Sequence, residues 1–413
     1  MENLLKIMSA YVFWYPLIMS MIWIVGGLLF YVRIERLPDL DLEKSPKVSI
    51  LVPCYNEQST IFETIKQLDK LNYEDYEIIA INDGSRDNTV EKLKELSLLY
   101  KRLRIIDLKK NSGKANALFL GLIASKGEII VGIDADAFLD EDALKYIVPH
   151  FTTSNYGERV GAVTGNPRVR NRSSLLAKVQ LCEFSSIIGL IKRSQRMLGK
   201  VMTVSGVVAA YRKSALLDCG MWDRDTITED IGVTWKLQKR FWDIRYEPRA
   251  VCWMLAPETL KGYWKQRVRW AQGGIEALLK HWDIFFDWRQ RRLTPIYLEQ
   301  VFSILWSVSW LVTVTVYFLY YLRIKALTYP VFWSGEYLTL ICVIQFLIAM
   351  FMDSRYDRSI LRYYLWAIWY PTFYWYFNAL VIIRAIPKAI FKNKNRSFAV
   401  WESPDRGIGS SDN

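Results

Sequence analysis

The chain has 413 residues, 52% of them apolar and 15% aromatic, with a formal net charge of +12. This apolar content is high for a protein that lies wholly in water, and the length allows one large globular domain plus smaller parts. The basic residues flank apolar segments or are scattered, which favours anionic lipid headgroups over nucleic acid as a partner. Five cysteines without paired spacing and two distant histidines indicate neither a disulfide framework nor a zinc site.

Four apolar stretches are each long enough to cross roughly 30 Å of hydrocarbon as a helix. They are residues 7–32, 300–322, 326–352 and 363–383. Trp and Tyr crowd their ends, where amphipathic rings lie among lipid headgroups. The first stretch lacks a small-residue cleavage pattern, so residues 1–32 are predicted to be a transmembrane anchor rather than a signal peptide. Residues 296–390 are predicted to form further transmembrane or interfacial helices.

A hydrophilic block follows the first apolar stretch, and we assign residues 33–272 to one globular domain. Short β-branched runs at 48–52, 77–81, 104–108 and 128–133 alternate with helical patterns at 59–71, 88–100 and 114–125. This rhythm predicts an α/β domain with a mostly parallel, Rossmann-like sheet and crossover helices.

Polar residues follow three of the predicted strands. They are Tyr55, Asn56 and Glu57, then Asn82 and Asp83, then Asp134 and Asp136. Ligands of parallel sheets bind beyond the carboxyl ends of the strands, so these clusters are expected to converge on one crevice. The carboxylates of Asp134 and Asp136 are hard oxygen ligands of the kind that Mg²⁺ or Mn²⁺ prefers. The Asp-x-Asp pattern is short, however, and solvated turn acids are the default explanation of so short a pattern.

Two further motifs lie within the block. Thr228-Glu229-Asp230 offers a carboxylate that could accept a proton from a hydroxyl, or else a helix start with Thr228 as the N-cap. Lys114 follows Asn111-Ser112-Gly113, which lacks the spacing of an ATPase phosphate loop, although a lysine there could still meet a nucleotide phosphate.

The end of the block carries Gln266-Arg267-Val268-Arg269-Trp270. Guanidinium groups bind phosphates bidentately and an indole offers a flat face to a sugar, so the motif fits a diphosphate clamp. A snorkelling basic helix is the alternative. Beyond it, residues 275–288 read as an amphipathic helix, and we assign 273–295 either to the membrane interface or to a helix that covers the globular domain.

Several of these residues lie in longer strings of the chain: Cys54-Tyr55-Asn56-Glu57, Asn82-Asp83-Gly84-Ser85 and Gly113-Lys114-Ala115-Asn116-Ala117-Leu118. Taken in chain order with the other motifs, these strings resemble the motifs of the processive family 2 glycosyltransferases. The resemblance implies a GT-A glycosyltransferase domain on the cytoplasmic side of the membrane. Four other strings are similar to one branch, the poly-β-1,6-N-acetyl-D-glucosamine synthases of biofilm-forming bacteria: Ala162 to Arg168, Ile191 to Gln195, Pro257 to Leu260 and Trp401 to Gly407.

The resemblance also implies roles for single residues. Tyr55, Glu57 and Asp83 would hold the uracil, Lys114 a nucleotide phosphate, and Asp134 the ribose side. Asp136 would bind the metal, Mg²⁺ or Mn²⁺, and Asp230 would be the catalytic base. Gln266 and Arg269 would hold the diphosphate, and Trp270 would stack on the acceptor sugar. Asp230, Asp136 and Asp134 are therefore the expected catalytic acids.

The implied partners are UDP-N-acetylglucosamine, the growing poly-N-acetylglucosamine chain, the lipid bilayer of a bacterial plasma membrane and a small accessory membrane subunit. A synthase of chitin, hyaluronan or a cellulose-type glycan would share every catalytic motif. A polyprenyl-phosphate glycosyltransferase would share Asp-x-Asp but does not need the Gln-x-x-Arg-Trp pattern. A transporter would place its polar groups within the apolar stretches.

The C-terminal tail, residues 391–413, gives two conflicting expectations. Four spans and a cytoplasmic domain place it outside, but Lys388, Lys392, Lys394 and Arg396 favour the cytoplasm. By analogy with related synthases, residues 401–407 are a possible gating segment that closes over the bound donor.

Overall fold

The computed structural model describes residues 2–324 and 330–391, apart from residues 39, 41, 43 and 155. The chain divides into two compact units. The sheet unit comprises Glu35–Ala177 and Lys200–Tyr263, and the helical unit comprises Met1–Ile34, Lys178–Gly199 and Trp264–Lys392. The predicted domain 33–272 differs from this division, because residues 178–199 and 264–272 group with the helices.

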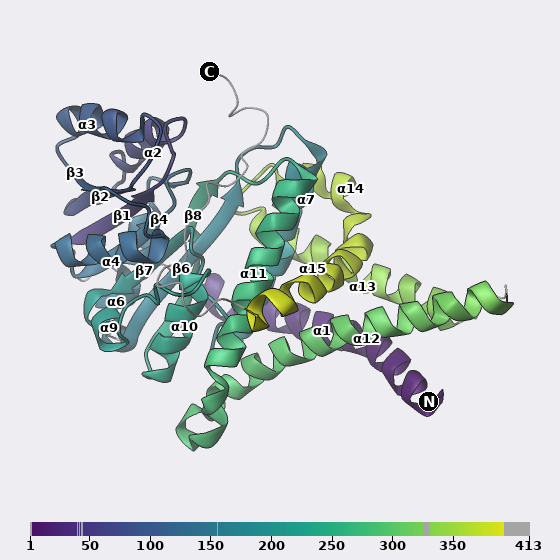
Figure 1. Ribbon diagram of the computed structural model, residues 1–413. Helices are drawn as coiled ribbons and strands as arrows, with labels where there is room; N and C mark the ends of the chain where they lie inside the picture. Colours follow the sequence, from purple (N-terminus) through teal and green to yellow (C-terminus); the bar gives the residue numbers. More distant parts are fainter. Residues whose placement is uncertain are drawn as a thin grey trace. The chain divides into compact units, whose positions relative to one another are not determined.

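The sheet unit is built on eight strands in the order β3-β2-β1-β4-β7-β6-β8-β5 (Figure 1). The strands are β1 Val48–Cys54, β2 Tyr76–Asp83, β3 Leu103–Leu108, β4 Ile129–Ile133, β5 Phe138–Leu139, β6 Val160–Val169, β7 Val208–Arg212 and β8 Asp243–Met254. Strands β1 to β4 pair in parallel, as do β6 and β8, while β7 is antiparallel to both its neighbours and β5 is antiparallel to β8. The four predicted strands and the mostly parallel sheet are confirmed.

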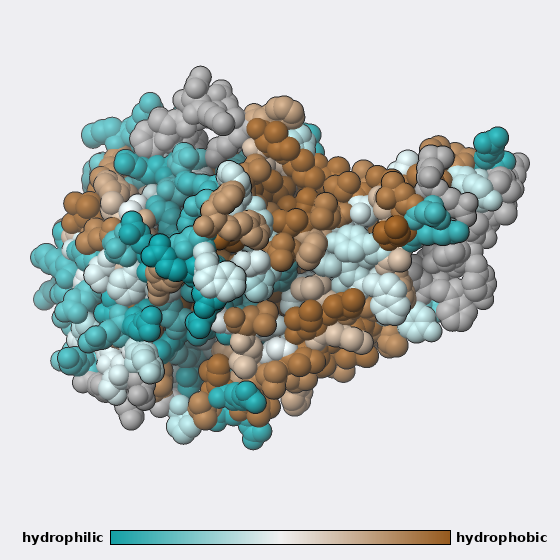
Figure 2. Space-filling view, turned by 90° about the horizontal axis from the view of Figure 1, so that it is seen from below, coloured by the Kyte–Doolittle hydropathy of each residue, from teal (hydrophilic) through white to brown (hydrophobic). Residues whose placement is uncertain are grey.

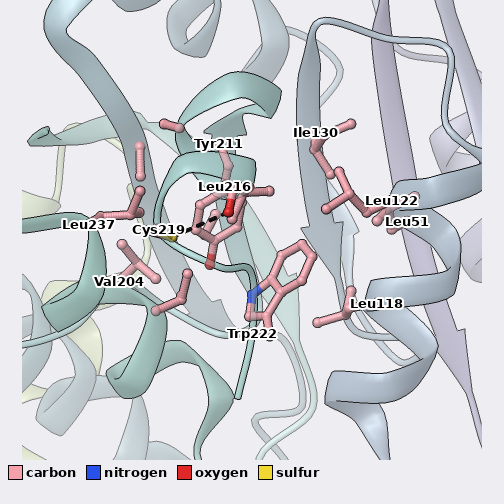
Figure 3. Packing of buried hydrophobic residues seen from close by; sticks show 14 of the residues in the cluster. Leu51, Leu118, Leu122, Ile130, Val204, Tyr211, Leu216, Cys219, Trp222 and Leu237 are labelled. Atoms are coloured by element: carbon pink, nitrogen blue, oxygen red, sulfur yellow. Dashed lines mark hydrogen bonds between the residues drawn. The ribbon is translucent and has the colours of Figure 1, made fainter. Parts of the chain in front are cut away.

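The predicted crossover helices are also confirmed, as α2 Ile61–Leu68, α3 Thr89–Leu99 and α4 Lys114–Ala124. The other helices of this unit are α5 Ala143–Ile147, α6 Pro149–Thr152, η2 Gly157–Arg159, α9 Lys213–Asp218 and α10 Glu229–Lys239. In the core, Leu118 and Leu122 of α4 lie near Leu51 of β1, and the Trp222 indole lies between this group and Tyr211 (Figure 3). Burial of these large side chains at about 25 cal/mol per Å² stabilises the sheet unit.

The helical unit contains long helices and several short ones. They are α1 Glu2–Phe30, η1 Tyr31–Glu35, α7 Leu175–Glu183, η3 Phe184–Leu190, α8 Ile191–Met197, α11 Leu260–Lys280, η4 Trp282–Phe286, η5 Trp288–Leu293, α12 Thr294–Ile324, α13 Pro330–Asp353, η6 Ile360–Tyr363, α14 Tyr364–Ala367 and α15 Tyr370–Ile390. Helices α7 and α11 begin within the residues of the sheet unit. Helix α1 packs against α8, α12 and α13, and α15 packs against α12 and α13.

Three helical segments in the described residues are long and apolar enough to cross a membrane: Asn3–Glu35, Trp288–Arg323 and Glu336–Asp353. Hydrophobic side chains such as Ile7, Phe318 and Leu340 are exposed along them, and Figure 2 shows broad hydrophobic surface on the molecule. Exposed apolar area of this extent indicates lipid as the solvent, so the chain is a membrane protein. The fourth predicted stretch, 363–383, is not among these candidates, and it is divided among η6, α14 and α15.

Residues 178–199 pack among the long helices, although the sequence placed them in the globular domain. The Ser194 hydroxyl donates to the Ile22 carbonyl of α1 at 3.1 Å. A Cβ on Gly26 would overlap Ser194, so glycine is required for this close approach. Arg193 and Asp353, both fully buried, form an ion pair at 2.9 Å that ties α8 to the end of α13.

The predicted amphipathic helix 275–288 is shorter than expected. Helix α11 ends at Lys280 and two 3₁₀ helices follow, the second capped by Asp287, whose carboxylate accepts from the Arg289 N–H at 3.0 Å. The aromatic side chains of this stretch are exposed: Trp282, Phe285, Phe286 and Trp288. This exposure opposes the covering-helix alternative, and a location at the membrane interface stays a prediction.

Candidate active site

Asp83 organises the loop that precedes α4. Its carboxylate is fully buried and accepts from the backbone N–H groups of Ser112 at 2.9 Å and Gly113 at 2.7 Å. Gly113 has a φ of 88°, which favours glycine. Burial raises the pKa of Asp83, and the two N–H donors partly oppose that shift. Two N–H groups of the loop that resembles a phosphate loop therefore bind the Asp83 carboxylate.

The residues after β1 are fixed by the loop after β2. The Asn56 N–H donates to the Ser85 hydroxyl at 2.9 Å, and the Glu57 N–H donates to the Thr89 hydroxyl at 2.8 Å. The buried Glu57 carboxylate accepts from the Thr60 hydroxyl at 2.7 Å, at the start of α2. The structure thus brings Tyr55, Glu57 and Asp83 to neighbouring strand ends, although Glu57 is partly engaged in this local contact.

Lys114 stands at the centre of an ion cluster. Its ammonium lies 2.6 Å from Asp134 Oδ1 and 3.0 Å from Glu229 Oε1, and it donates to the Gly206 carbonyl at 3.1 Å. Burial opposes the charge, but the two carboxylates prevail and raise the pKa of Lys114 above its ordinary value. The first residue of α4 is thereby joined to the end of β4 and to the start of α10.

Asp230 lies in the first turn of α10, where the helix dipole favours a negative charge. Its Oδ2 accepts from the Gly206 N–H at 3.1 Å, and its Oδ1 accepts from the Ile231 N–H at 2.9 Å. Thr228 occupies the N-cap position but makes no side-chain capping hydrogen bond. The motif therefore starts a helix, as one interpretation predicts. The role of Asp230 as a proton acceptor stays a prediction.

A small cavity adjoins these groups, lined by Lys114, Glu229, Asp230, Gly206, Tyr211 and Trp222, among others. The rings of Tyr211 and Trp222 meet edge to face with centroids 5.5 Å apart (Figure 3). Burial, followed by the charge of Asp230, raises the pKa of the Tyr211 hydroxyl, which therefore stays neutral. Glu229 and Asp230 thus line the cavity together with the aromatic rings of Tyr211 and Trp222.

Asp134 and Asp136 follow β4, and pairing of β5 with β8 fixes the turn that carries them. Burial, followed by the charges of Asp134 and Asp136, raises the pKa of the Cys252 thiol on β8. Among the described residues, no group of three or more His, Cys, Asp and Glu side chains could hold a metal by itself. Two carboxylates still fit Mg²⁺ or Mn²⁺, because such ions commonly complete their shell with substrate phosphates and water.

The predicted diphosphate clamp lies on α11, within the helical unit. Gln266 and Trp270 are half-buried, Arg269 is exposed, and the intervening Arg267 is buried. These residues belong to a different unit from Asp83, Lys114 and Asp230. The possible gating segment, 401–407, lies outside the described residues.

Two participants were not predicted as site residues. The sequence singles out Glu229 only as part of the Thr228-Glu229-Asp230 motif and gives no prediction for Gly206, yet both residues contact Lys114. An acid adjacent to Asp230 was the available signal for Glu229. Gly206 acts through its backbone, so no side-chain pattern could identify it.

Comparison with known proteins is consistent with this geometry. Residues 46–273 match the model of a family described as "Glycosyltransferase like family 2". Two relatives, from Staphylococcus epidermidis and Staphylococcus aureus (strain COL), are both named poly-beta-1,6-N-acetyl-D-glucosamine synthase. Each is 44% identical over an alignment that covers 96% of this chain and 98% of the relative.

Among solved structures, a mannosyltransferase from Pyrobaculum calidifontis in complex with GDP-Man and Mn²⁺ has a similar fold. The TM-score is 0.65 at 19% sequence identity, with 94% of this chain and 100% of that chain covered. The predicted GT-A fold is confirmed. By its motifs, its fold and its relatives, the chain belongs to glycosyltransferase family 2.

Proposed function

We propose that this enzyme transfers N-acetylglucosamine from UDP-N-acetylglucosamine to the end of a growing β-1,6-linked poly-N-acetylglucosamine chain. The observation that carries the proposal is the 44% identity to two synthases so named, over 96% of the chain. The Lys114 cluster is consistent with it, because it joins a cation for a diphosphate to the carboxylates that a transfer reaction needs.

The chemistry is a single in-line displacement. The acceptor's 6-hydroxyl oxygen bonds to C1 of the donor sugar while the bond between C1 and the UDP oxygen breaks, so the α-linked donor becomes a β-glycoside. The hydroxyl proton passes to the Asp230 carboxylate. The backbone N–H groups of Gly206 and Ile231 hold that carboxylate in a fixed orientation. Uracil lies by Tyr55, Glu57 and Asp83, and ribose lies by Asp134.

The leaving UDP gains negative charge, which Lys114, Gln266 and Arg269 stabilise by charge and hydrogen bonding. A divalent cation, held by Asp136 with support from Asp134, would neutralise part of the same charge. The fold neighbour bound to Mn²⁺ is consistent with this requirement, and either Mg²⁺ or Mn²⁺ suits the oxygen donors. Trp270 presents its ring to the acceptor sugar.

The sheet unit is cytoplasmic in this proposal, because UDP-sugars are cytoplasmic, and the helical unit lies in the plasma membrane. The polar product cannot cross lipid unaided, so the spans provide its route and couple synthesis to export. A small accessory membrane subunit completes that route, as the resemblance implies.

The direct test supplies membranes containing the enzyme with UDP-N-acetylglucosamine, UDP-glucose or UDP-glucuronic acid, and determines the product linkage. We expect polymer from UDP-N-acetylglucosamine alone, resistant to β-1,4-specific chitinase and cleaved by a β-1,6-specific hexosaminidase. A chitinase-sensitive product would identify a chitin synthase instead. A product extracted with lipid and limited to one sugar would indicate a polyprenyl-phosphate glycosyltransferase.

A further inference from the structure

Arg267 is a buried charged residue within the Gln266–Trp270 motif on α11. Its guanidinium lies 2.9 Å from Glu183 Oε2 at the end of α7, and both side chains are less than one tenth exposed. The same guanidinium lies over the Trp270 ring, 4.2 Å from its centroid. One cation therefore links an acid from a distant part of the sequence to the predicted acceptor platform.

Helix α11 is fixed on a second side. Val268 and Ile275 pack in a cluster with Val381 and Ala385 of α15. Arg267 and Trp270 are three residues apart and so share another face of the helix. The packing against α15 fixes the backbone of α11. The orientations of the side chains on the other face are then set by the contacts that Arg267 makes with them.

Arg267 also determines the orientation of the Gln266 amide. Its Nη1 donates to Gln266 Oε1 at 3.1 Å. A guanidinium has only donors, so the amide oxygen must face Arg267 and the amide –NH₂ must face away. An –NH₂ group donates hydrogen bonds, which is what a diphosphate oxygen requires.

The contact with Trp270 has a similar effect. The guanidinium covers one face of the indole, and the Phe184 ring meets it at a centroid distance of 6.2 Å and an angle of 62°. A cation over an indole face is attracted by the ring's electron cloud, which favours the Trp270 orientation that keeps this contact. The opposite face of the indole is then the one that a sugar ring can use.

We propose that Arg267, with Glu183 as its counter-ion, is a positioning residue that orients both the diphosphate donor Gln266 and the acceptor platform Trp270. It touches neither substrate and acts through its two neighbours. This inference rests on the proposed function, because it takes the roles of Gln266 and Trp270 from there.

The test uses full-length enzyme in membranes and the variants Arg267→Lys and Glu183→Gln. Lysine keeps the ion pair with Glu183 but lacks the planar fork that reaches Gln266 and stacks on Trp270. We expect Arg267→Lys to insert normally, to raise the KM for UDP-N-acetylglucosamine and the Kd for UDP about tenfold, and to shorten the polymer. Glu183→Gln should shift the same three quantities in the same direction by a smaller factor.

Two controls separate positioning from general structure. Arg193→Lys makes the same change in another buried ion pair of the helical unit, one that does not involve α11, so it should leave the KM and the polymer length at their wild-type values. The exchanged pair Glu183→Arg with Arg267→Glu restores opposite charges, but the side chain at position 267 then has no N–H group to donate to the Gln266 amide oxygen. It should recover insertion without recovering the KM.

Wild-type KM and polymer length in Arg267→Lys would overturn the proposal, as would recovery of both by the exchanged pair. The UDP Kd does not depend on which sugar is polymerised. If the wild type bound UDP but polymerised another sugar, the proposed function would fail while the Kd comparison still tested Arg267.

Discussion

Lys114 and Asp230 both bind the backbone of Gly206, with the ammonium donating to its carbonyl and the carboxylate accepting from its N–H. The cation and the predicted base are thus held by the two polar groups of one residue. Glu229, the neighbour of Asp230, contacts the ammonium directly. The two adjacent acids of α10 therefore contact different groups, so a variant of one acid is a matched control for a variant of the other.

Replacing Asp230 separates chemistry from binding. We expect Asp230→Asn to keep UDP affinity within about twofold and to reduce polymer formation by roughly 100-fold or more, because an amide cannot accept the hydroxyl proton. Glu229→Gln should instead raise the donor KM, since it weakens the hold on Lys114, with a much smaller effect on kcat. Measurement of UDP binding and turnover on both variants checks this; equal turnover in wild type and Asp230→Asn would assign Asp230 to helix capping alone.

Asp136 is expected to be needed for metal rather than for folding. Asp136→Asn should insert into the membrane at the wild-type level but lose nearly all polymer synthesis, because one carboxylate ligand is lost. Treatment of the wild type with EDTA should give the same loss, reversed by Mg²⁺ or Mn²⁺. Normal synthesis by the variant or by EDTA-treated membranes would refute the metal requirement.

At the scale of elements, the Arg193–Asp353 pair joins α8 to α13 at full burial. Removal of one partner, as in Asp353→Ala, should destabilise the helical unit by about 3–5 kcal/mol, because a charge stays buried without compensation. The apolar double variant Arg193→Met with Asp353→Leu should recover most of that loss. Apparent melting temperatures in detergent test this order, and a double variant no more stable than Asp353→Ala would contradict it.

A second element contact predicts a pH dependence. Glu247 of β8 is buried and accepts from Arg249 Nε at 2.8 Å and lies 2.9 Å from His150 Nε2. Burial opposes ionisation, but hydrogen bonds from Arg249 and His150 lower the pKa of Glu247 from 4.5 to about 2. A lowered carboxyl pKa gives stability that is complete above pH 4.5 and is lost as the pH falls towards 2.

The size of this effect is on the order of 3 kcal/mol, because each pKa unit corresponds to about 1.4 kcal/mol. We expect the melting temperature of wild type to fall more steeply below pH 4.5 than that of Glu247→Gln, which has no carboxylate to protonate there. Parallel curves for the two proteins would show that Glu247 does not control acid stability.

Sequence patterns identified the first half of the sheet because β1 to β4 and their helices combine short buried strands with amphipathic helices. The same patterns missed the insertion of residues 178–199 into the helical unit. That segment is short, and Lys192 and Arg193 make it look like part of a hydrophilic domain. Its charge is compensated by Asp353, 160 residues away, and no local pattern reports so distant a partner. For the same reason the Lys114–Glu229 contact was not predicted.

At the scale of the whole molecule, the number of spans determines the side of the tail. Between Tyr263 and Asp353 the described chain has two candidate spans, Trp288–Arg323 and Glu336–Asp353. Two crossings return the chain to the side from which it started, so we expect the residues directly after Asp353 to share the side of the sheet unit. The tail shares that side where α15 does not cross, which agrees with the basic residues that favour the cytoplasm.

Cysteine labelling tests this topology with little background, because all five native cysteines are buried. Leu98 on α3 is 87% exposed, which makes Leu98→Cys a reporter for the sheet unit. Ser403→Cys reports on the tail. An impermeant maleimide should label neither variant in intact cells and both after permeabilisation. Labelling of Ser403→Cys alone in intact cells would place the tail outside and exclude its gating role.

The Arg193–Asp353 pair also constrains how the protein is made. Residue 193 leaves the ribosome 160 residues before residue 353, which at 5–20 residues per second is a delay of roughly 8–32 s. During that interval α8 lacks the helix that neutralises its arginine, so α1 and α8 are expected to assemble completely only after α13 has been inserted. A nascent chain stalled before residue 353 would carry the Arg193 guanidinium without its Asp353 counter-ion, a feature that quality-control proteases could recognise.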